Sequence, residues 1–264
     1  MGDIKEMTYP DMLSRFRERR NESEFLLPLM SQAGQCFDAF KTVQSCLSIG
    51  PGPGEYDLEF MKRCLPSLRR LVAVEKDQFC AEELKINIAK IYNGTLTSHV
   101  IVGDVENFVP EGGQRFDSVL MFHMLYDLPT EGRKKLLKTA LDQWIDQENG
   151  VIVIINMSDD LDDKKQPINV MQKLHRHFSD RMDLLLEADF IREDLKPLGS
   201  DVVWSQKYKC DLDFRVYDSD IAQLFNLYTD KFIDNETMKR ALDACEPSLL
   251  GTYVGEMLIV KKKH

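Results

Sequence analysis

Residues 47–60 read LSIGPGPGEYDLEF, and this stretch decides the fold class. A short apolar run is followed by a turn with three glycines, and a helix-compatible acidic segment begins at Glu55. A strand, a glycine turn and a helix in this order open a nucleotide-binding α/β sheet. Glycines let the backbone turn sharply and let a ligand approach it closely. We therefore expect Gly50, Gly52 and Gly54 to contact a ligand.

Two prolines, Pro51 and Pro53, narrow the choice of ligand. The spacing is G-x-G-x-G and differs from the dinucleotide pattern G-x-G-x-x-G. Proline has no backbone N–H, so the loop lacks two donors that would bind a pyrophosphate. A ligand with an adenosine and no phosphate fits better, which indicates S-adenosylmethionine. A nucleotide-dependent oxidoreductase is the alternative that these prolines disfavour.

The next two predicted strands also end in acids. Residues 71–75 form an apolar run that ends at Glu75, one strand–helix–strand unit after the glycine loop. A carboxylate at a solvent-accessible strand tip could accept hydrogen bonds from both ribose hydroxyls. The simpler alternative for Glu75 is an acid near a helix start. Residues 100–102 lead to Asp104, where an acid would hold the adenine amino group.

Residues 116–127 read FDSVLMFHMLYD and predict a fourth strand that ends in a polar cluster. Open parallel sheets bind ligands beyond the carboxyl ends of their strands. The candidates at this end are Phe122, His123, Tyr126 and Asp127. A histidine there could accept a proton near neutral pH. Tyr126 could instead be a core residue whose hydroxyl is satisfied.

Strands and helices alternate along most of the chain. We expect strands near 45–49, 71–75, 98–102, 116–122 and 150–156, with helices near 55–64, 78–92 and 131–145. Such alternation predicts an α/β fold with a parallel sheet and helices on both faces, the Rossmann-like class I methyltransferase sheet. Strands near 202–210 and 255–261 would close it as an antiparallel hairpin. We expect a helix over 188–198 with Gly199 as its C-cap, and helices over 8–44 with Asn21 as an N-cap.

The chain is expected to be one domain spanning residues 1–264. Residues 1–44 would form an N-terminal helical lid. Insertions at about 159–182 and 214–250 would form a small helical substrate-binding cap, with an extra helix over 167–178.

Composition excludes several classes of protein. The chain has 264 residues, 43% hydrophobic and 30% charged, as in ordinary globular proteins. Its net charge of −10 argues against nucleic-acid binding, which needs Lys and Arg to neutralise phosphates. The six cysteines include no C-x-x-C pair, which favours a reduced intracellular protein without a zinc site. No apolar run reaches membrane length, so we expect a cytoplasmic protein. We also expect a monomer.

Five stretches resemble the histamine N-methyltransferase family. They are the Arg15-Phe16 region leading to Glu22, LSIGPGPGEYDL at 47–58, Val74-Glu75, Met124-Leu125-Tyr126, and Met257-Leu258-Ile259-Val260. Ser48 resembles that family too, because most class I methyltransferases have an acid there. The resemblance spans nearly the whole length, and the glycine motif is shared by all class I enzymes.

The resemblance implies methyl transfer from S-adenosylmethionine, without a metal, to a nitrogen of a small amine. It places Gly50, Glu75 and Phe122 at the cofactor, and Cys80 joins these candidate contacts. It places Glu22 at the substrate amine and Tyr126 in the substrate pocket, so Glu22, His123 and Tyr126 are the candidate catalytic residues.

The sequence departs from the family at three pocket positions. His123 stands where the family has Gln, Asp127 where it has Tyr, and Tyr253 near the position of a substrate-binding Asn. If a helical turn follows Phe122, His123 and Asp127 could face the pocket together as an oriented base pair. These departures do not change the expected reaction, which is methyl transfer. They leave the identity of the substrate undetermined.

Three functions remain after the sequence analysis. The first is an N-methyltransferase that acts on a small amine or a histamine-like imidazole. The second is a small-molecule O-methyltransferase, although no set of residues suits a magnesium–catechol site. The third is a non-catalytic cofactor-binding protein with the same fold.

Overall fold

The computed structural model describes residues 9–158, 188–215, 233–245 and 250–263, apart from the side chains of Tyr9, Met12, Asp127, Ala188, Asp189 and Cys245. The expected helix over 167–178 and most of both cap insertions lie outside these ranges. Within them, seven strands form one sheet in the order β3-β2-β1-β4-β5-β7-β6.

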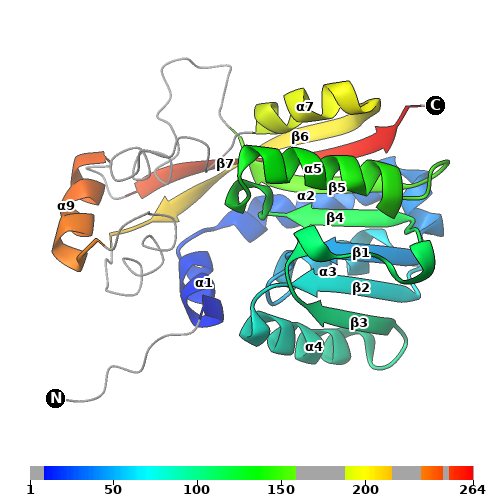
Figure 1. Ribbon diagram of the computed structural model, residues 1–264. Coiled ribbons are helices and arrows are strands. Elements are labelled where there is room, and N and C mark those ends of the chain that lie inside the picture. Colours follow the sequence, from blue (N-terminus) through cyan, green and yellow to red (C-terminus); the bar gives the residue numbers. More distant parts are fainter. Residues whose placement is uncertain (1–8, 159–187, 216–232, 246–249, 264) are drawn as a thin grey trace.

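The sheet is parallel except at one end (Figure 1). Its strands are β1 Ser45–Ile49, β2 Arg70–Glu75, β3 Thr97–Val102, β4 Ser118–Phe122, β5 Val151–Met157, β6 Ser200–Asp213 and β7 Leu250–Lys262. The first five pair in parallel, while β7 runs antiparallel to both β5 and β6. The expected parallel sheet and its closing antiparallel pair are confirmed.

Helices connect and flank the strands. The α-helices are α1 Tyr9–Glu18, α2 Glu22–Cys36, α3 Glu55–Cys64, α4 Gln78–Tyr92, α5 Thr130–Thr139, α7 Ala188–Leu195 and α9 Asn235–Cys245. The short helices are η1 Asp38–Thr42, η2 Val105–Asn107, η3 Glu111–Gly113, η4 Leu125–Asp127, the π-turn η5 Ala140–Trp144, and η6 Lys196–Leu198. Gly199 follows η6 with φ +63°, which is the expected left-handed C-cap.

Alternating strand residues face two separate cores. In β4, Leu120 and Phe122 belong to the core that contains residues of α2, α3 and α4. Their neighbours Val119 and Met121 belong to the core built from α5 and α7. Because side chains alternate across a strand, these two cores lie on opposite faces of the sheet. Helices therefore cover both faces, as the sequence predicts (Figure 1).

The β6–β7 pair continues past the end of β5. The last residue of β5, Met157, pairs with Gly255, so residues 250–254 pair with β6 alone. In Figure 1 this ribbon projects beyond the sheet toward α9. The chain between α1 and α2 joins the ribbon through a bridge from Arg20 to Leu212. The ribbon thereby fixes this N-terminal segment near the carboxyl ends of the parallel strands.

Asn21 does not cap α2 with its side chain, contrary to our prediction. Its side-chain Oδ1 accepts a hydrogen bond of 2.7 Å from the backbone N–H of Asp211 in β6. The side chain therefore ties α2 to the ribbon instead of satisfying the helix start.

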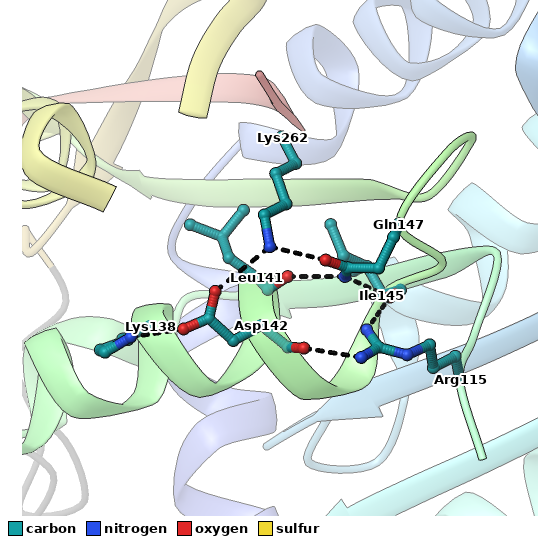
Figure 2. Close-up of polar contacts among 7 residues, drawn as sticks. All are labelled: Arg115, Lys138, Leu141, Asp142, Ile145, Gln147 and Lys262. Carbon is teal, nitrogen blue, oxygen red and sulfur yellow. Dashed lines mark hydrogen bonds and ion pairs between the residues drawn. The ribbon is translucent and has the colours of Figure 1, made fainter. Parts of the chain in front are cut away.

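The helix expected over 131–145 ends in the π-turn η5, which polar side chains hold (Figure 2). Arg115 donates to the carbonyls of Asp142 and Ile145, each at 2.9 Å. Gln147 also donates to the Ile145 carbonyl, and its own carbonyl accepts from Lys262 of β7. These bonds satisfy carbonyls that a helix end leaves without partners.

Candidate functional site

A pocket lies beyond the carboxyl ends of β1, β2, β3 and β4, with α1 as one wall. Its empty space, including the open mouth, is about 1140 Å³. The glycine loop, Glu75 and Asp104 line one half, and Arg20, His123 and Tyr126 line the other.

All three glycines of the loop adopt left-handed backbone conformations. The φ angles are +60° at Gly50, +58° at Gly52 and +86° at Gly54. A Cβ at Gly54 would lie 2.4 Å from Cδ1 of Leu84, which is buried in α4. The loop thus requires glycine for its conformation and for the close approach of α4.

The loop has no glycine N–H left for a phosphate. Gly50 N donates to the carbonyl of Val74 at 2.8 Å, and Gly54 N donates to the carbonyl of Pro51 at 3.0 Å. Gly52 N donates to Oε2 of Glu75 at 2.8 Å. Since the two prolines have no N–H either, the loop cannot bind a pyrophosphate in the dinucleotide manner.

Glu75 is buried, with 5% of its surface exposed, and not solvent-accessible as we expected. Besides holding Gly52, its Oε1 accepts a hydrogen bond of 2.9 Å from the backbone N–H of Asp77. A carboxylate has about four acceptor sites, so Glu75 can also accept from two hydroxyls. Its place on the pocket wall suits a ribose, and its two backbone bonds fix its direction.

We predict that Glu75→Ala weakens the binding of S-adenosylhomocysteine by about 1–3 kcal/mol, because hydrogen bonds to a charged group are lost. It should also lower the free energy of unfolding by about 1–3 kcal/mol, since the buried Gly52 N–H loses its acceptor. Calorimetry and urea unfolding measure the two effects. Glu75→Gln is the control, because its amide oxygen can still accept from Gly52. If Glu75→Ala binds S-adenosylhomocysteine as tightly as the wild type, Glu75 stabilises the loop and does not bind the cofactor.

Three other predicted cofactor residues differ in where they lie. Asp104 is exposed at the start of η2 and lines the pocket, as does the buried ring of Phe122. Cys80, in the first turn of α4, does not line it, and its side chain is buried. A cofactor contact from Cys80 therefore stays a prediction that the pocket lining does not support.

Asp57 in α3 is a pocket residue that our sequence analysis missed. Its Oδ1 accepts a hydrogen bond of 2.6 Å from the hydroxyl of Ser48, and both residues are buried. Burial raises the pKa of Asp57 to about 6, although the Ser48 bond opposes this shift. The carboxylate that β1 lacks at Ser48 is thus supplied by α3. A polar residue three positions after Gly54, on the face turned to β1, was the available signal.

We predict that Asp57→Asn stabilises the ligand-free protein above pH 6 by about 3 kcal/mol, the equivalent of two pKa units. The folded protein keeps the Asp57 proton up to about pH 6, whereas the unfolded chain loses it near pH 4. The free energy of unfolding of the wild type therefore falls as pH rises through this window. Urea unfolding from pH 4 to 8 tests this. Parallel curves for wild type and variant would contradict the raised pKa.

Glu22 is the centre of a buried polar cluster behind the pocket wall. It has no exposed surface and accepts a hydrogen bond of 2.5 Å from the hydroxyl of Tyr208. Arg20 Nη2 lies 2.9 Å from its Oε2, and His123 Nε2 lies 3.2 Å from its Oε1. Burial alone would raise the pKa of Glu22, but Arg20, His123 and the hydrogen bonds hold it well below its usual range.

Glu22 does not line the pocket, so its predicted direct contact with a substrate amine stays a prediction. The neighbours that it holds, Arg20 and His123, line the pocket instead. In this structure Glu22 is a positioning residue, and a substrate would meet a guanidinium and an imidazole before it met the carboxylate.

The ring of His123 has a polar neighbour at each nitrogen. Besides the contact to Glu22, its Nδ1 lies 3.2 Å from the hydroxyl of Tyr253, which is buried. Its backbone has φ +54°, an uncommon conformation for a residue other than glycine, and its N–H donates to Ile155 in β5. Nδ1 is hydrogen-bonded and Nε2 lies against Glu22, so the ring surface of His123 is what faces the pocket. The expected direct substrate contact of Tyr253 is replaced by its bond to His123, since Tyr253 does not line the pocket.

Aromatic rings surround His123. The ring centroid of Tyr56 lies 5.8 Å from that of His123, and the ring of Tyr126 lies 6.4 Å from it. Both tyrosines line the pocket, together with Phe16 of α1. The side chain of Asp127 lies outside the described residues, so its proposed pairing with His123 stays a prediction. The described walls suit a flat or small apolar substrate body.

Arg17 and Arg20 are two further pocket residues that our sequence analysis missed. The four arginines within residues 15–20 were the available signal, but they read only as a charged N-terminus. Only the fold shows which of them turn inward.

The described residues contain no group of three or more His, Cys, Asp or Glu side chains that could hold a metal ion. Among the described helices, none is long and apolar enough to cross a membrane.

Comparisons with known proteins support the fold and not a family. No family model matches the chain, and no curated protein matches it by sequence. Many solved structures match, all those described here at low sequence identity.

Three of these structures illustrate the likeness. A putative sarcosine dimethylglycine methyltransferase from Galdieria sulphuraria has a TM-score of 0.56 and 14% identity, over 90% of this chain and 85% of that one. An S-adenosylmethionine-dependent methyltransferase from Clostridium acetobutylicum has a TM-score of 0.51 and 12% identity, over 89% and 90%. The [4+2]-cyclase SpnF has a TM-score of 0.55 and 12% identity, over 88% and 80%. Together with the strand order, these matches show that the chain has the Rossmann-like fold of class I S-adenosylmethionine-dependent methyltransferases.

Proposed function

We propose that this protein binds S-adenosylmethionine and transfers its methyl group to a nitrogen of a small amine or imidazole. The glycine loop supports this most strongly. Its N–H groups are absent or already bonded, so it favours an adenosine ligand without a phosphate bridge. The fold of the chain agrees with this choice of cofactor.

The residues on one half of the pocket fit the cofactor. Glu75 has free acceptor sites for ribose hydroxyls, and Asp104 at the end of β3 can accept from an adenine amino group. The ionised form of Asp57 can attract an ammonium group. When bound, S-adenosylmethionine would supply an electrophilic methyl group on its sulfonium.

The other half of the pocket can orient a small nucleophile. An uncharged nitrogen lone pair must point at the methyl group, and positioning of this kind can supply roughly 7–11 kcal/mol in intramolecular reactions. Tyr56, Tyr126 and the fixed ring of His123 provide three walls for this purpose. Glu22 contributes by holding His123 and Arg20 in place. No dedicated base is required when the nitrogen is already neutral.

Methyl transfer to oxygen is the second candidate function. Arg17 and Arg20 place positive charge on the pocket wall, which would lower the pKa of a bound phenol and favour its nucleophilic anion. A non-catalytic cofactor-binding role is the third, since a fold does not fix a function. The complete glycine loop and Glu75 argue against loss of cofactor binding.

Methyl transfer from labelled S-adenosylmethionine to imidazoles, aliphatic amines and phenols tests the proposal. We expect label on an amine or imidazole, and we expect Glu75→Ala to reduce the rate as it reduces cofactor binding. Label on phenols alone would favour the O-methyltransferase. Tight cofactor binding without transfer to any acceptor would favour the non-catalytic role.

A further inference from the structure

Arg20 is a nearly buried cation on the wall of the pocket. Its side chain is 6% exposed and comes from the segment that the β6–β7 ribbon fixes. The guanidinium carbon lies 4.9 Å from the ring centroid of Phe16 and 5.4 Å from that of Tyr253. These rings hold the group in one orientation, and Glu22 behind it compensates its charge.

The guanidinium has donors to spare. It has five N–H groups, and within the described part of the chain its side chain contacts one acceptor, Glu22. Its Nε is buried and has no hydrogen-bond partner among the described residues. A buried donor without an acceptor is costly, so the site is incomplete until an acceptor arrives.

Charges are distributed unevenly around the pocket. The acids that line it are Asp57, Glu75, Asp104 and Glu106, which come from α3 and from the ends of β2 and β3. Near Arg20 the wall is formed by Arg17, His123 and the tyrosines, and the nearest carboxylate, Glu22, faces the back of Arg20. Each arginine here has a carboxylate partner, Glu55 for Arg17 and Glu22 for Arg20, but neither carboxylate lines the pocket, so a ligand meets the guanidinium groups first.

We infer that the substrate carries a carboxylate and that the Arg20 guanidinium binds it. A planar guanidinium matches a carboxylate with two parallel hydrogen bonds. Combined with a methyl-accepting nitrogen, this describes a small amino-acid-like molecule. The inference rests on the proposed function and names its substrate class. The cofactor also carries a carboxylate on its methionine part, so the two sources must be separated.

The experiment measures binding in the presence of saturating S-adenosylhomocysteine, so it does not depend on turnover. The probes are three pairs that differ only in a carboxylate: histidine and histamine, tyrosine and tyramine, glycine and methylamine. We expect at least one carboxylated member to bind more tightly than its amine partner. The variant is the double substitution Arg20→Met with Glu22→Gln, which removes both buried charges together.

In the double variant, the carboxylated probe should lose about 10- to 100-fold in affinity, the equivalent of charged hydrogen bonds, while its amine partner loses little. Arg20→Lys should give a smaller loss, because lysine keeps the charge without the planar fork. Arg69→Met, which removes an exposed arginine far from the pocket, should change nothing.

The two sources of carboxylate give different results. If the double variant loses affinity for S-adenosylhomocysteine and not for the probes, Arg20 binds the cofactor and the inference is overturned. Tighter binding of all three amines than of their carboxylated partners also overturns it. Carboxylate preference without methyl transfer to any probe would support the Arg20 site and count against the proposed function.

Discussion

Replacing Glu22 by alanine is expected to lower the free energy of unfolding by about 3–5 kcal/mol, the usual effect of removing one partner of a buried ion pair. The carboxylate has no exposed surface, and it bonds Arg20 and Tyr208. Without it, a buried guanidinium is left without its counter-charge. Urea unfolding at neutral pH measures the loss.

Glu24→Ala is the matched control, because Glu24 lies in the same first turn of α2 and is exposed. It should change stability by less than about 0.5 kcal/mol. The milder variant Glu22→Gln should lower kcat/KM far more than affinity for S-adenosylhomocysteine, since Glu22 positions Arg20 and His123 on the substrate side. If Glu22→Ala changes the free energy of unfolding as little as Glu24→Ala does, the buried cluster around Glu22 does not form in solution.

Gly54→Ala is expected to lower the free energy of unfolding by about 2–5 kcal/mol, adding left-handed backbone strain to overpacking. The new Cβ would lie 2.4 Å from Cδ1 of Leu84 and 3.1 Å from Leu58. Either these leucine side chains or the loop must therefore shift, and a shift of the loop would lower cofactor affinity. Unfolding curves and calorimetry with S-adenosylhomocysteine measure both effects.

Gly94→Ala separates the two causes. Gly94 has φ +80°, close to the +86° of Gly54, and a Cβ there meets nothing within 4 Å. Gly94→Ala should therefore lower the free energy of unfolding by the backbone strain alone, about 1–2 kcal/mol. Its affinity for the cofactor should not change. Equal losses in the two variants would show that α4 does not pack closely on the loop.

The fold was predictable because its signals are local. The apolar run before Gly50, the glycine turn and the acid at Glu75 lie within one strand–helix–strand unit, and Gly50, Gly52 and Glu75 line the pocket. Gly54 does not line it and instead packs against Leu84 of α4. The glycine requirement follows largely from backbone conformation, and at Gly54 also from the close approach of α4. Element bounds differed mainly at β6 and β7, which extend as a ribbon beyond the sheet.

The substrate side was less predictable because its contacts are long-range. Glu22 lies 186 residues from Tyr208, and no local pattern announces that bond. As a first-turn acid of a helix, Glu22 gave no sign of being fully buried. Asn21 was expected to cap the helix, but a backbone N–H of β6 competed for its side chain. Arg20 turned inward because of its bridge to Leu212, which only the fold shows.

The choice of cofactor is tested most directly by calorimetric titration of the wild-type protein with S-adenosylhomocysteine and, separately, with NAD. We predict micromolar binding of S-adenosylhomocysteine and none of NAD, because the glycine loop has no N–H for a pyrophosphate while Glu75 remains open to a ribose. Tighter binding of NAD than of S-adenosylhomocysteine would contradict this account.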